Sequence, residues 1–311
     1  MRVAVIGRTK ALIDASRRLK QHGHTVALVW TCPHDDYYAM SSSESFRLLA
    51  REVGADFVND IDIGHAENIA RLHSSQCEVA VSVNWLTVLT APVLTAFPHG
   101  VLNAHAGDLP RFRGNAVVNW AILAGEPNIG LCVHRMETEL DAGAVYARRR
   151  LSLAADTYVG EVWAWIESSI PEMFAETVDA IAAGTTKPEV QSTDPRNILR
   201  AYPRRPEDGR IDWRQPVEQI FRLIRASSRP YSGAFTNFEG EKQVIVWRAV
   251  PAPQQSAFLA VPGQVCYRSE GDPVIACGDG MLRLTEVEVA GCETNAAAKQ
   301  LIHRSLRARL G

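Results

Sequence analysis

The chain lacks the cysteine patterns that would indicate a structural zinc site or a disulfide framework. Its six cysteines are Cys32, Cys77, Cys132, Cys266, Cys277 and Cys292. No two of them have CxxC or CxxxxC spacing, and no secretory signal peptide precedes them. We therefore expect free thiols in the reducing environment of the cytoplasm.

Long apolar runs and an excess of one charge are also missing. No apolar stretch approaches the roughly 20 residues that a membrane span needs. The net charge is -2 and the pI is about 6.5, so the composition provides no general attraction to nucleic acid or to an anionic membrane. We expect a soluble protein without a membrane partner.

Two phosphate-binding motifs are absent as well. The apolar run 2–6 is followed by Gly7-Arg8-Thr9-Lys10 instead of G-x-G-x-x-G, and no acidic residue stands where a ribose would be held. The chain contains no G-x-x-x-x-G-K-[ST] either. Dinucleotide binding and a P-loop therefore have no support in the sequence.

The patterns that are present predict an α/β domain in the first part of the chain. Residues 2–6 and 25–30 are β-branched runs, and an amphipathic stretch, 9–21, separates them. Such a strand, helix, strand unit is typical of a parallel sheet with crossover helices. Further expected strands are 78–83, 100–103 and 129–136, and helical spacing runs through 155–183. We expect one α/β domain over residues 1–184.

The character of the chain changes after this domain. Residues 185–215 contain four prolines and are expected to be a linker. A short helix over 217–226 precedes five strand-like runs, 233–238, 243–250, 263–267, 274–277 and 281–289. We predict a small second domain over residues 216–311, built as a β-barrel or half-barrel.

Three polar residues indicate chemistry. Asn103 and His105 end an apolar run and are two positions apart, so their side chains point the same way from an extended segment. Asp141 follows in a turn-forming context. An amide that donates to an oxyanion, an imidazole that moves a proton and a carboxylate that orients it predict acyl transfer. Neither Cys132 nor Ser82 fits as a nucleophile, so the pattern favours direct attack by a substrate amine on an activated acyl donor.

The segments around these residues resemble one family. The matching segments are Asn103-Ala-His105, Leu109-Pro110-Arg-Phe-Arg113-Gly114, Asn119-Trp120-Ala-Ile-Leu-Ala-Gly125, Gly130, His134-Arg-Met136 and Asp141-Ala-Gly143. They are similar to the 10-formyltetrahydrofolate-dependent formyltransferases, which include methionyl-tRNA, glycinamide ribonucleotide and nucleotide-sugar enzymes. Residues 208–213, 224–226, 230 and 276–280 extend the resemblance to nearly the full chain.

The resemblance implies a fold, and this chain departs from the family's sequence at one loop. The implied fold is a Rossmann-like parallel-sheet formyltransferase domain followed by a small C-terminal β-barrel, OB-like domain. The family commonly has serine and leucine where this chain has Gly107 and Asp108. Because Asn103, His105 and Asp141 are intact, the departure concerns the loop and not the trio.

The resemblance also implies roles. Asn103 would donate to the tetrahedral oxyanion, and His105 would assist proton transfer or stabilise that charge. Asp141 would hold His105 in a productive tautomer and accept the amine proton. His134, in a predicted strand, is interpreted as structural. The formyl donor 10-formyltetrahydrofolate would be held, without a metal, by residues of two segments: Val83, Asn84 and Trp85, and Glu137, Thr138, Glu139 and Leu140.

Three acceptor amines fit such an enzyme: charged initiator tRNA, a nucleotide-linked amino sugar, and a small amine such as hydroxyornithine. Binding of tRNA needs many lysine and arginine contacts, but residues 32–45 contain none, and residues 204–311 hold 15 basic against 12 acidic residues. The resemblance is strongest to the sugar enzymes, so we predict a nucleotide-linked amino sugar and consider tRNA unlikely. Arg113 and Arg8 are the predicted contacts for its diphosphate, and a homodimer is possible.

Two interpretations other than a formyltransferase stay open at this point. A folate-binding protein without activity would not need the trio. A hydrolase would pass the formyl group to water instead of an amine. Release of formate in the absence of any amine distinguishes a hydrolase from a transferase.

Overall fold

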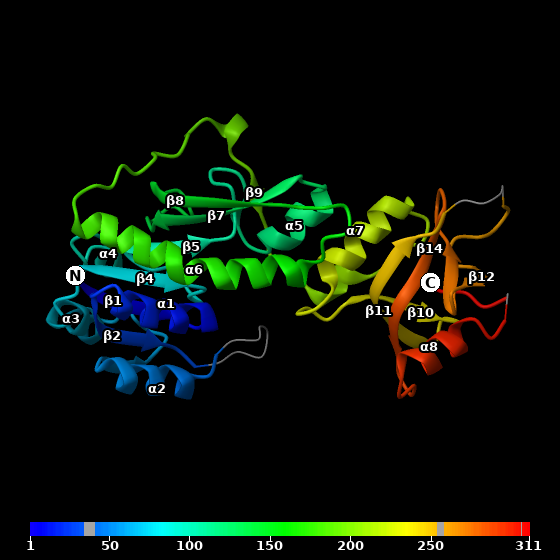
Figure 1. Cartoon of the computed structure of the whole chain (residues 1–311), viewed down its shortest axis with the longest axis horizontal. Helices are drawn as coiled ribbons and strands as arrows, with labels where there is room; N and C mark the ends of the chain where they lie inside the picture. Colours follow the sequence, from blue (N-terminus) through cyan, green and yellow to red (C-terminus); the bar gives the residue numbers. More distant parts are fainter. Residues whose placement is uncertain (34–40, 254–257, 306) are drawn as a thin grey trace. The chain divides into compact units, whose positions relative to one another are not determined.

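The computed structural model describes residues 1–33, 41–253, 258–305 and 307–311, and these form two compact units (Figure 1). Unit 1 comprises residues 1–117, 128–151 and 163–202. Unit 2 comprises residues 118–127, 152–162 and 203–311. Among the described residues, no helix has both the length and the hydropathy that a membrane span requires.

Unit 1 is built on a seven-stranded sheet in the order β3-β2-β1-β4-β5-β7-β8. Its strands are β1 (Arg2–Gly7), β2 (Thr25–Thr31), β3 (Asp56–Asn59), β4 (Val79–Val83), β5 (Val101–His105), β7 (Asn128–Arg135) and β8 (Val145–Ser152). Strands β1 to β5 pair in parallel, whereas β7 pairs antiparallel with β5. The prediction of a Rossmann-like α/β domain is confirmed, with a mixed rather than an all-parallel sheet.

Helices lie between and after these strands, and the apolar periodicity predicted those over 9–21 and 155–183. They are α1 (Lys10–Gln21), α2 (Ser43–Val53), α3 (Ala66–Ser74), α4 (Ala91–Leu94), α5 (Val117–Ala124) and α6 (Val159–Ala182). Thr9 caps α1 by accepting from the Leu12 amide, and Ser42 caps α2 in the same way through the Ser45 amide. The central strand β1 is buried from Val3 onward, so its continuous apolar run fits a strand that is covered on both faces.

The segment after α6 contributes to unit 1 through backbone pairing. Val145 and Glu189 exchange two hydrogen bonds of 2.8 Å. Further on, β9 (Arg200–Ala201) pairs in parallel with β6 (Arg113–Gly114). Residues 185–202 therefore lie against the segments that carry Arg113 and Asp141, although their composition is typical of a linker. The boundaries expected at residues 184 and 215 stay a prediction.

Unit 2 contains a five-stranded antiparallel sheet in the order β10-β11-β14-β13-β12. Its elements are α7 (Val217–Ser227), β10 (Ala234–Phe238), β11 (Lys242–Pro251), β12 (Val265–Ser269), β13 (Asp272–Ala276), β14 (Met281–Val289) and α8 (Asn295–Ile302). Leu310 bridges to Phe238 beside β10, and Arg309 bridges to Gln264 beside β12. The last residues thus join the two sheet edges, as the predicted small barrel requires.

Candidate active site

Strand β5 brings Asn103 and His105 to one face of the sheet, and β7 adds His134. The register pairs Asn103 with His134 and His105 with Cys132. The amide nitrogen Nδ2 of Asn103 lies 3.3 Å from Nε2 of His134. The prediction from alternation, that an amide and an imidazole converge, therefore agrees with the geometry, and a second imidazole joins them.

The carboxylate of Asp141 lies between the two rings. Its Oδ2 is 3.7 Å from His105 Nδ1, and its Oδ1 is 3.5 Å from His134 Nε2. The backbone amide of Gly114 donates to Oδ2 at 2.8 Å. Asp141 is only 9% exposed, and its backbone is left-handed with φ of 53°. The structure thus brings all three predicted residues together in a buried site.

Electrostatics keep Asp141 ionised. Burial alone raises the pKa of its carboxyl, but the attraction of the His105 and His134 rings and the Gly114 hydrogen bond outweigh burial and lower this pKa to about 2. Asp141 is therefore an anion at neutral pH. A buried anion that faces two titratable rings is an arrangement suited to proton transfer.

His105 is held in one tautomer by a backbone carbonyl. Its Nε2 donates to the oxygen of Phe112 at 2.7 Å, because a carbonyl can only accept. Burial lowers the pKa of the imidazole, and the Asp141 carboxylate offsets only part of this effect. The ring is therefore neutral at neutral pH, with its lone pair on Nδ1, which faces Asp141. The two groups together can accept one proton.

The departure at Gly107 has a steric explanation. A Cβ atom at this position would lie 2.7 Å from His105 Nε2 and 2.6 Å from the Phe112 oxygen, the two atoms of the hydrogen bond just described. Phe112 itself has a positive φ of 63°. The close approach of the loop to the ring therefore requires glycine at residue 107.

Asp108, the other departure, anchors the same loop to β8. Its carboxylate accepts hydrogen bonds from Arg148 and Arg150, the latter at 2.9 Å from Nε. Arg148 also donates to the Leu109 oxygen at 2.8 Å. The family's common leucine would have no such partners, so this chain attaches its loop through an ionic contact.

Neither Cys132 nor Ser82 is activated as a nucleophile. Burial raises the pKa of the Cys132 thiol to about 11, and its Sγ faces the Gly107 oxygen at 3.1 Å. Ser82 is fully buried, and its hydroxyl has no hydrogen-bond partner among the described residues. The site therefore fits direct attack, without a covalent enzyme intermediate.

The two predicted substrate arginines are bound by the protein itself. Arg113 is buried, and its Nε and Nη2 donate to Gln191 Oε1 at 3.1 and 2.9 Å, while Nη1 donates to Glu139 Oε1 at 3.1 Å. Arg8 is buried as well and donates from Nε to the Asn84 oxygen at 3.3 Å. A role for either residue in binding a diphosphate stays a prediction.

The segments expected to hold the formyl donor are loops of unit 1. Val83 ends β4, and the exposed Asn84 with φ of 55° turns the chain toward Trp85. Glu137, Thr138, Glu139 and Leu140 are all exposed. In the part of the chain that the structure describes, no group of three His, Cys, Asp or Glu side chains is arranged to hold a metal ion.

Sequence reasoning missed three contributors to this site. His134 was expected to be structural, and this stays a prediction, but its place beside Asn103 and Asp141 was not foreseen. Phe112 acts through its carbonyl, which no side-chain motif shows. Gln191 lies in the expected linker, and its amide donates to the Asp141 and Gly143 oxygens at 2.8 and 2.7 Å.

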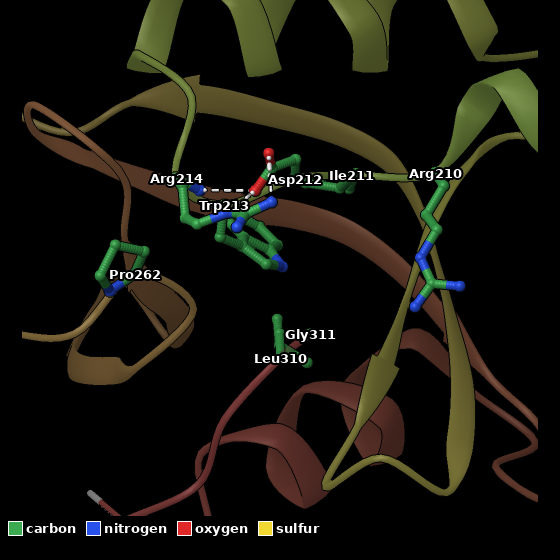
Figure 2. A pocket seen from close by; sticks show the side chains of 8 residues that line it. All are labelled: Arg210, Ile211, Asp212, Trp213, Arg214, Pro262, Leu310 and Gly311. Atoms are coloured by element: carbon green, nitrogen blue, oxygen red, sulfur yellow. Dashed lines mark hydrogen bonds and ion pairs between the residues drawn. The ribbon is translucent and has the colours of Figure 1, made fainter.

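A separate pocket of about 470 Å³ lies in unit 2 (Figure 2). It is lined by Arg210, Ile211, Asp212, Trp213, Arg214, Pro262, Leu310 and Gly311. Figure 2 shows Arg214 turned toward Asp212, and its Nε donates to Oδ1 at 2.8 Å. None of the residues predicted for catalysis or binding lines this pocket.

Comparison with known proteins shows what the chain is similar to. Methionyl-tRNA formyltransferase from Akkermansia muciniphila is 29% identical over 97% of this chain and 96% of its own length. HypX from Aquifex aeolicus, solved with tetrahydrofolic acid, matches with a TM-score of 0.64 and 20% identity over 96% of this chain. The chain spans about half the length of HypX, 47%.

A third similar structure is an N-formyltransferase from Helicobacter canadensis, solved with folinic acid and dTDP-3-aminofucose. It has a TM-score of 0.64 and 13% identity, over 91% of this chain and 98% of its own. Two family models match as well: formyl transferase over residues 1–178, and the formyl transferase C-terminal domain over residues 204–304. With the first model covering more than half of its residues, the chain belongs to the formyl transferase family.

Proposed function

We propose that this protein is an N-formyltransferase that moves the formyl group of 10-formyltetrahydrofolate to the amine of a nucleotide-linked amino sugar. One observation carries the proposal: the ionised, buried Asp141 lies 3.7 Å from the neutral His105 and close to His134, which contacts Asn103. This arrangement offers an oxyanion donor and a proton acceptor within one site.

The chemistry assigns each residue one task. The substrate amine forms a bond to the formyl carbon, and the bond between that carbon and the donor nitrogen breaks. Asn103 donates from Nδ2 to the oxygen, whose negative charge is largest in the tetrahedral state. The proton that the amine loses goes to the pair of His105 Nδ1 and Asp141, and the leaving nitrogen of the donor is protonated in turn.

The residues of this chain fit a reduced folate as donor. A pterin is flat and partly apolar, with several hydrogen-bonding atoms along its edge. Leu140, in the second of the two segments proposed to hold it, is a large exposed apolar side chain, and so are Leu86 and Val88, which follow the first segment. The backbone groups of residues 83–85 and 137–140 are proposed to bind its polar edge. Tetrahydrofolic acid in HypX and folinic acid in the Helicobacter canadensis enzyme support this choice.

The amino-sugar acceptor rests on two arguments. The Helicobacter canadensis enzyme was solved with dTDP-3-aminofucose and matches over nearly its whole length. The basic surplus after residue 204 is small for a tRNA site, with 15 basic and 12 acidic residues. Residues 32–45 also lack lysine and arginine, although residues 34–40 lie outside the described part of the chain.

Charged initiator tRNA is the second candidate acceptor. The full-length similarity to the Akkermansia muciniphila methionyl-tRNA formyltransferase favours it. A small amine such as hydroxyornithine is a third alternative. We place the reaction in the cytoplasm, since none of the six cysteines forms a disulfide. The family resemblance alone supports the further proposal of a homodimer.

A panel assay tests this proposal. The protein is incubated with 10-formyltetrahydrofolate and one acceptor at a time: uridine, thymidine and guanosine diphosphate amino sugars, hydroxyornithine, and charged initiator tRNA. We expect a formyl mass increment on one of the amino sugars. An increment on tRNA alone would make the acceptor assignment wrong, and formate released without any amine would indicate a hydrolase.

A further inference from the structure

Asp141 has a backbone conformation that needs support. Its φ of 53° lies in the left-handed region, which is unfavourable for residues with a Cβ atom, although aspartate adopts it more readily than most. A Cβ on the nearby Gly143 would lie 1.9 Å from the Arg135 oxygen, so the turn also packs tightly against β7. Such a turn keeps its shape only when the surrounding structure holds it.

The side chain of Gln191 provides this support. Its Nε2 donates one hydrogen to the Asp141 oxygen at 2.8 Å and the other to the Gly143 oxygen at 2.7 Å. Its Oε1 accepts from Arg113 Nε and Nη2 at 3.1 and 2.9 Å. Gln191 is 6% exposed. Because carbonyls face its nitrogen and guanidinium donors face its oxygen, the amide can have only one orientation.

Two consecutive residues of β6 position Asp141, one through its backbone and the other through its carboxylate. Arg113 orients Gln191, which binds the Asp141 backbone, and the Gly114 amide donates to the Asp141 carboxylate at 2.8 Å. Gln191 is fixed in turn, since its segment pairs with β8 through Glu189 and Val145. Side chain and backbone of Asp141 are therefore positioned by one continuous network.

We infer that Gln191 is a positioning residue of this enzyme, which acts through Asp141 and not through contact with substrate. The inference rests on the proposed function. Without the amide, the Asp141 and Gly143 oxygens lose their donor and the left-handed turn relaxes. The carboxylate then moves away from His105. A displacement of about 1 Å in such a site lowers the rate about 100-fold.

Loss of the Gln191 amide should change the pKa of His105. The groups that face this ring are Asp141, His134, the Phe112 oxygen and, across the strand pair, Cys132. The Asp141 carboxylate raises the pKa of His105 against the effect of burial. When the carboxylate moves away, the pKa of His105 falls further, which a general loss of stability would not produce.

The decisive variant is Gln191→Glu. It has the same size and still accepts from Arg113, but it has no hydrogens for the two carbonyl oxygens at neutral pH. The control is Ser192→Ala, which removes two hydrogen bonds of the same segment, from the Asp194 amide at 3.2 Å and from Asn197 Nδ2 at 3.1 Å. Gln191→Met, equally long and apolar, removes the same two hydrogens without adding a charge, so it is the variant in which the pKa of His105 is followed.

We expect kcat to fall about 100-fold in Gln191→Glu with KM for the donor nearly unchanged. Ser192→Ala should retain the wild-type profile. In Gln191→Met, which adds no charge near the ring, the acidic limb of kcat should move to lower pH, and the pKa of His105, followed by NMR in the protein alone, should fall. A wild-type kcat and an unmoved His105 pKa in a folded Gln191 variant overturn the inference. A wild-type protein that transfers no formyl group overturns the proposed function instead, while the NMR result still decides the inference.

Discussion

Each of the two units contains an aspartate whose carboxyl pKa is lowered to about 2, Asp141 in unit 1 and Asp212 in unit 2. For Asp141, burial opposes the shift, and attraction to His105 and His134 overcomes it. For Asp212 the main cause is the hydrogen bond from Arg214, and both side chains are solvent-exposed, 38% and 81% (Figure 2). A similar pKa thus arises in two different environments.

The difference shows which environment supports proton transfer. The partners of Asp141 are imidazoles, which gain and lose protons near neutral pH. The partner of Asp212 is a guanidinium, which stays charged, and water screens the pair. A lowered carboxyl pKa indicates a reactive site only when the partner titrates and solvent is excluded. Four experiments, three on activity and one on acid stability, test this comparison.

Asp141→Asn should have the largest effect. The amide cannot accept a proton together with His105, so we expect kcat to fall about 100- to 10,000-fold, the usual contribution of a positioned acid or base. Asp212→Asn is the matched control and should keep wild-type kinetics. Single-turnover rates of both variants measure the difference. Similar losses in the two variants would contradict the comparison.

Asn103→Ala should have the next largest effect. Removal of one oxyanion donor typically lowers kcat about 100- to 1000-fold, and the protein should remain folded because Asn103 is only partly buried. The control is Asn68→Ala, which removes a buried asparagine bound to Asp60 and the Asp62 oxygen, outside the site. That variant should lose stability and keep kcat. A wild-type kcat in Asn103→Ala would exclude the oxyanion role.

Gly107→Ser introduces the serine that the family commonly has at this position. Its Cβ would lie within 3 Å of His105 Nε2 and of the Phe112 oxygen, so the hydrogen bond that sets the tautomer must lengthen. We expect a fall in kcat of roughly tenfold to 100-fold, since ring displacements below 1 Å suffice for such losses. Ala106→Ser, a half-buried neighbour, serves as the control. An unchanged pH profile would show that the loop adapts.

The sequence was informative where local patterns determine structure. Alternation at the end of β5 predicted that Asn103 and His105 share a face, and apolar runs predicted β1, β2, β4, β5 and β7, whereas β3 and β8 were not predicted. The direction of β7 was not predictable, because apolar periodicity is the same in parallel and antiparallel strands. The turn-forming context singled out Asp141, and the resemblance implied its role beside His105.

The rest of the site depends on contacts between distant segments. Gln191 binds Asp141 across 50 positions of the chain, and it does so through backbone oxygens, which carry no sequence signal. The prolines and polar residues around Gln191 predicted a linker, because amino-acid composition does not reveal hydrogen bonds to another segment. Phe112 was missed for the same reason, because its carbonyl and not its ring holds His105.

The smallest expected effect is that of the Asp141 carboxylate on the stability of the fold at acid pH. The folded pKa of Asp141 is about 2 and its ordinary value is 3.8, so the carboxylate stabilises the fold above about pH 4 and this contribution is lost as the pH falls toward 2. The loss amounts to about 2 kcal/mol of unfolding free energy for this buried group. Denaturant unfolding at several pH values should therefore show a shallower acid decline in Asp141→Asn than in the wild type.

Asp212→Asn provides the contrast in the same experiment. The exposed pair with Arg214 should contribute little to stability, whatever its pKa, because water competes for both charges. High salt should remove its contribution and leave that of Asp141 nearly intact, since buried charges are screened less. Equal acid declines in the two variants would mean that burial adds nothing to the stabilisation, and the distinction between the two aspartates would fail.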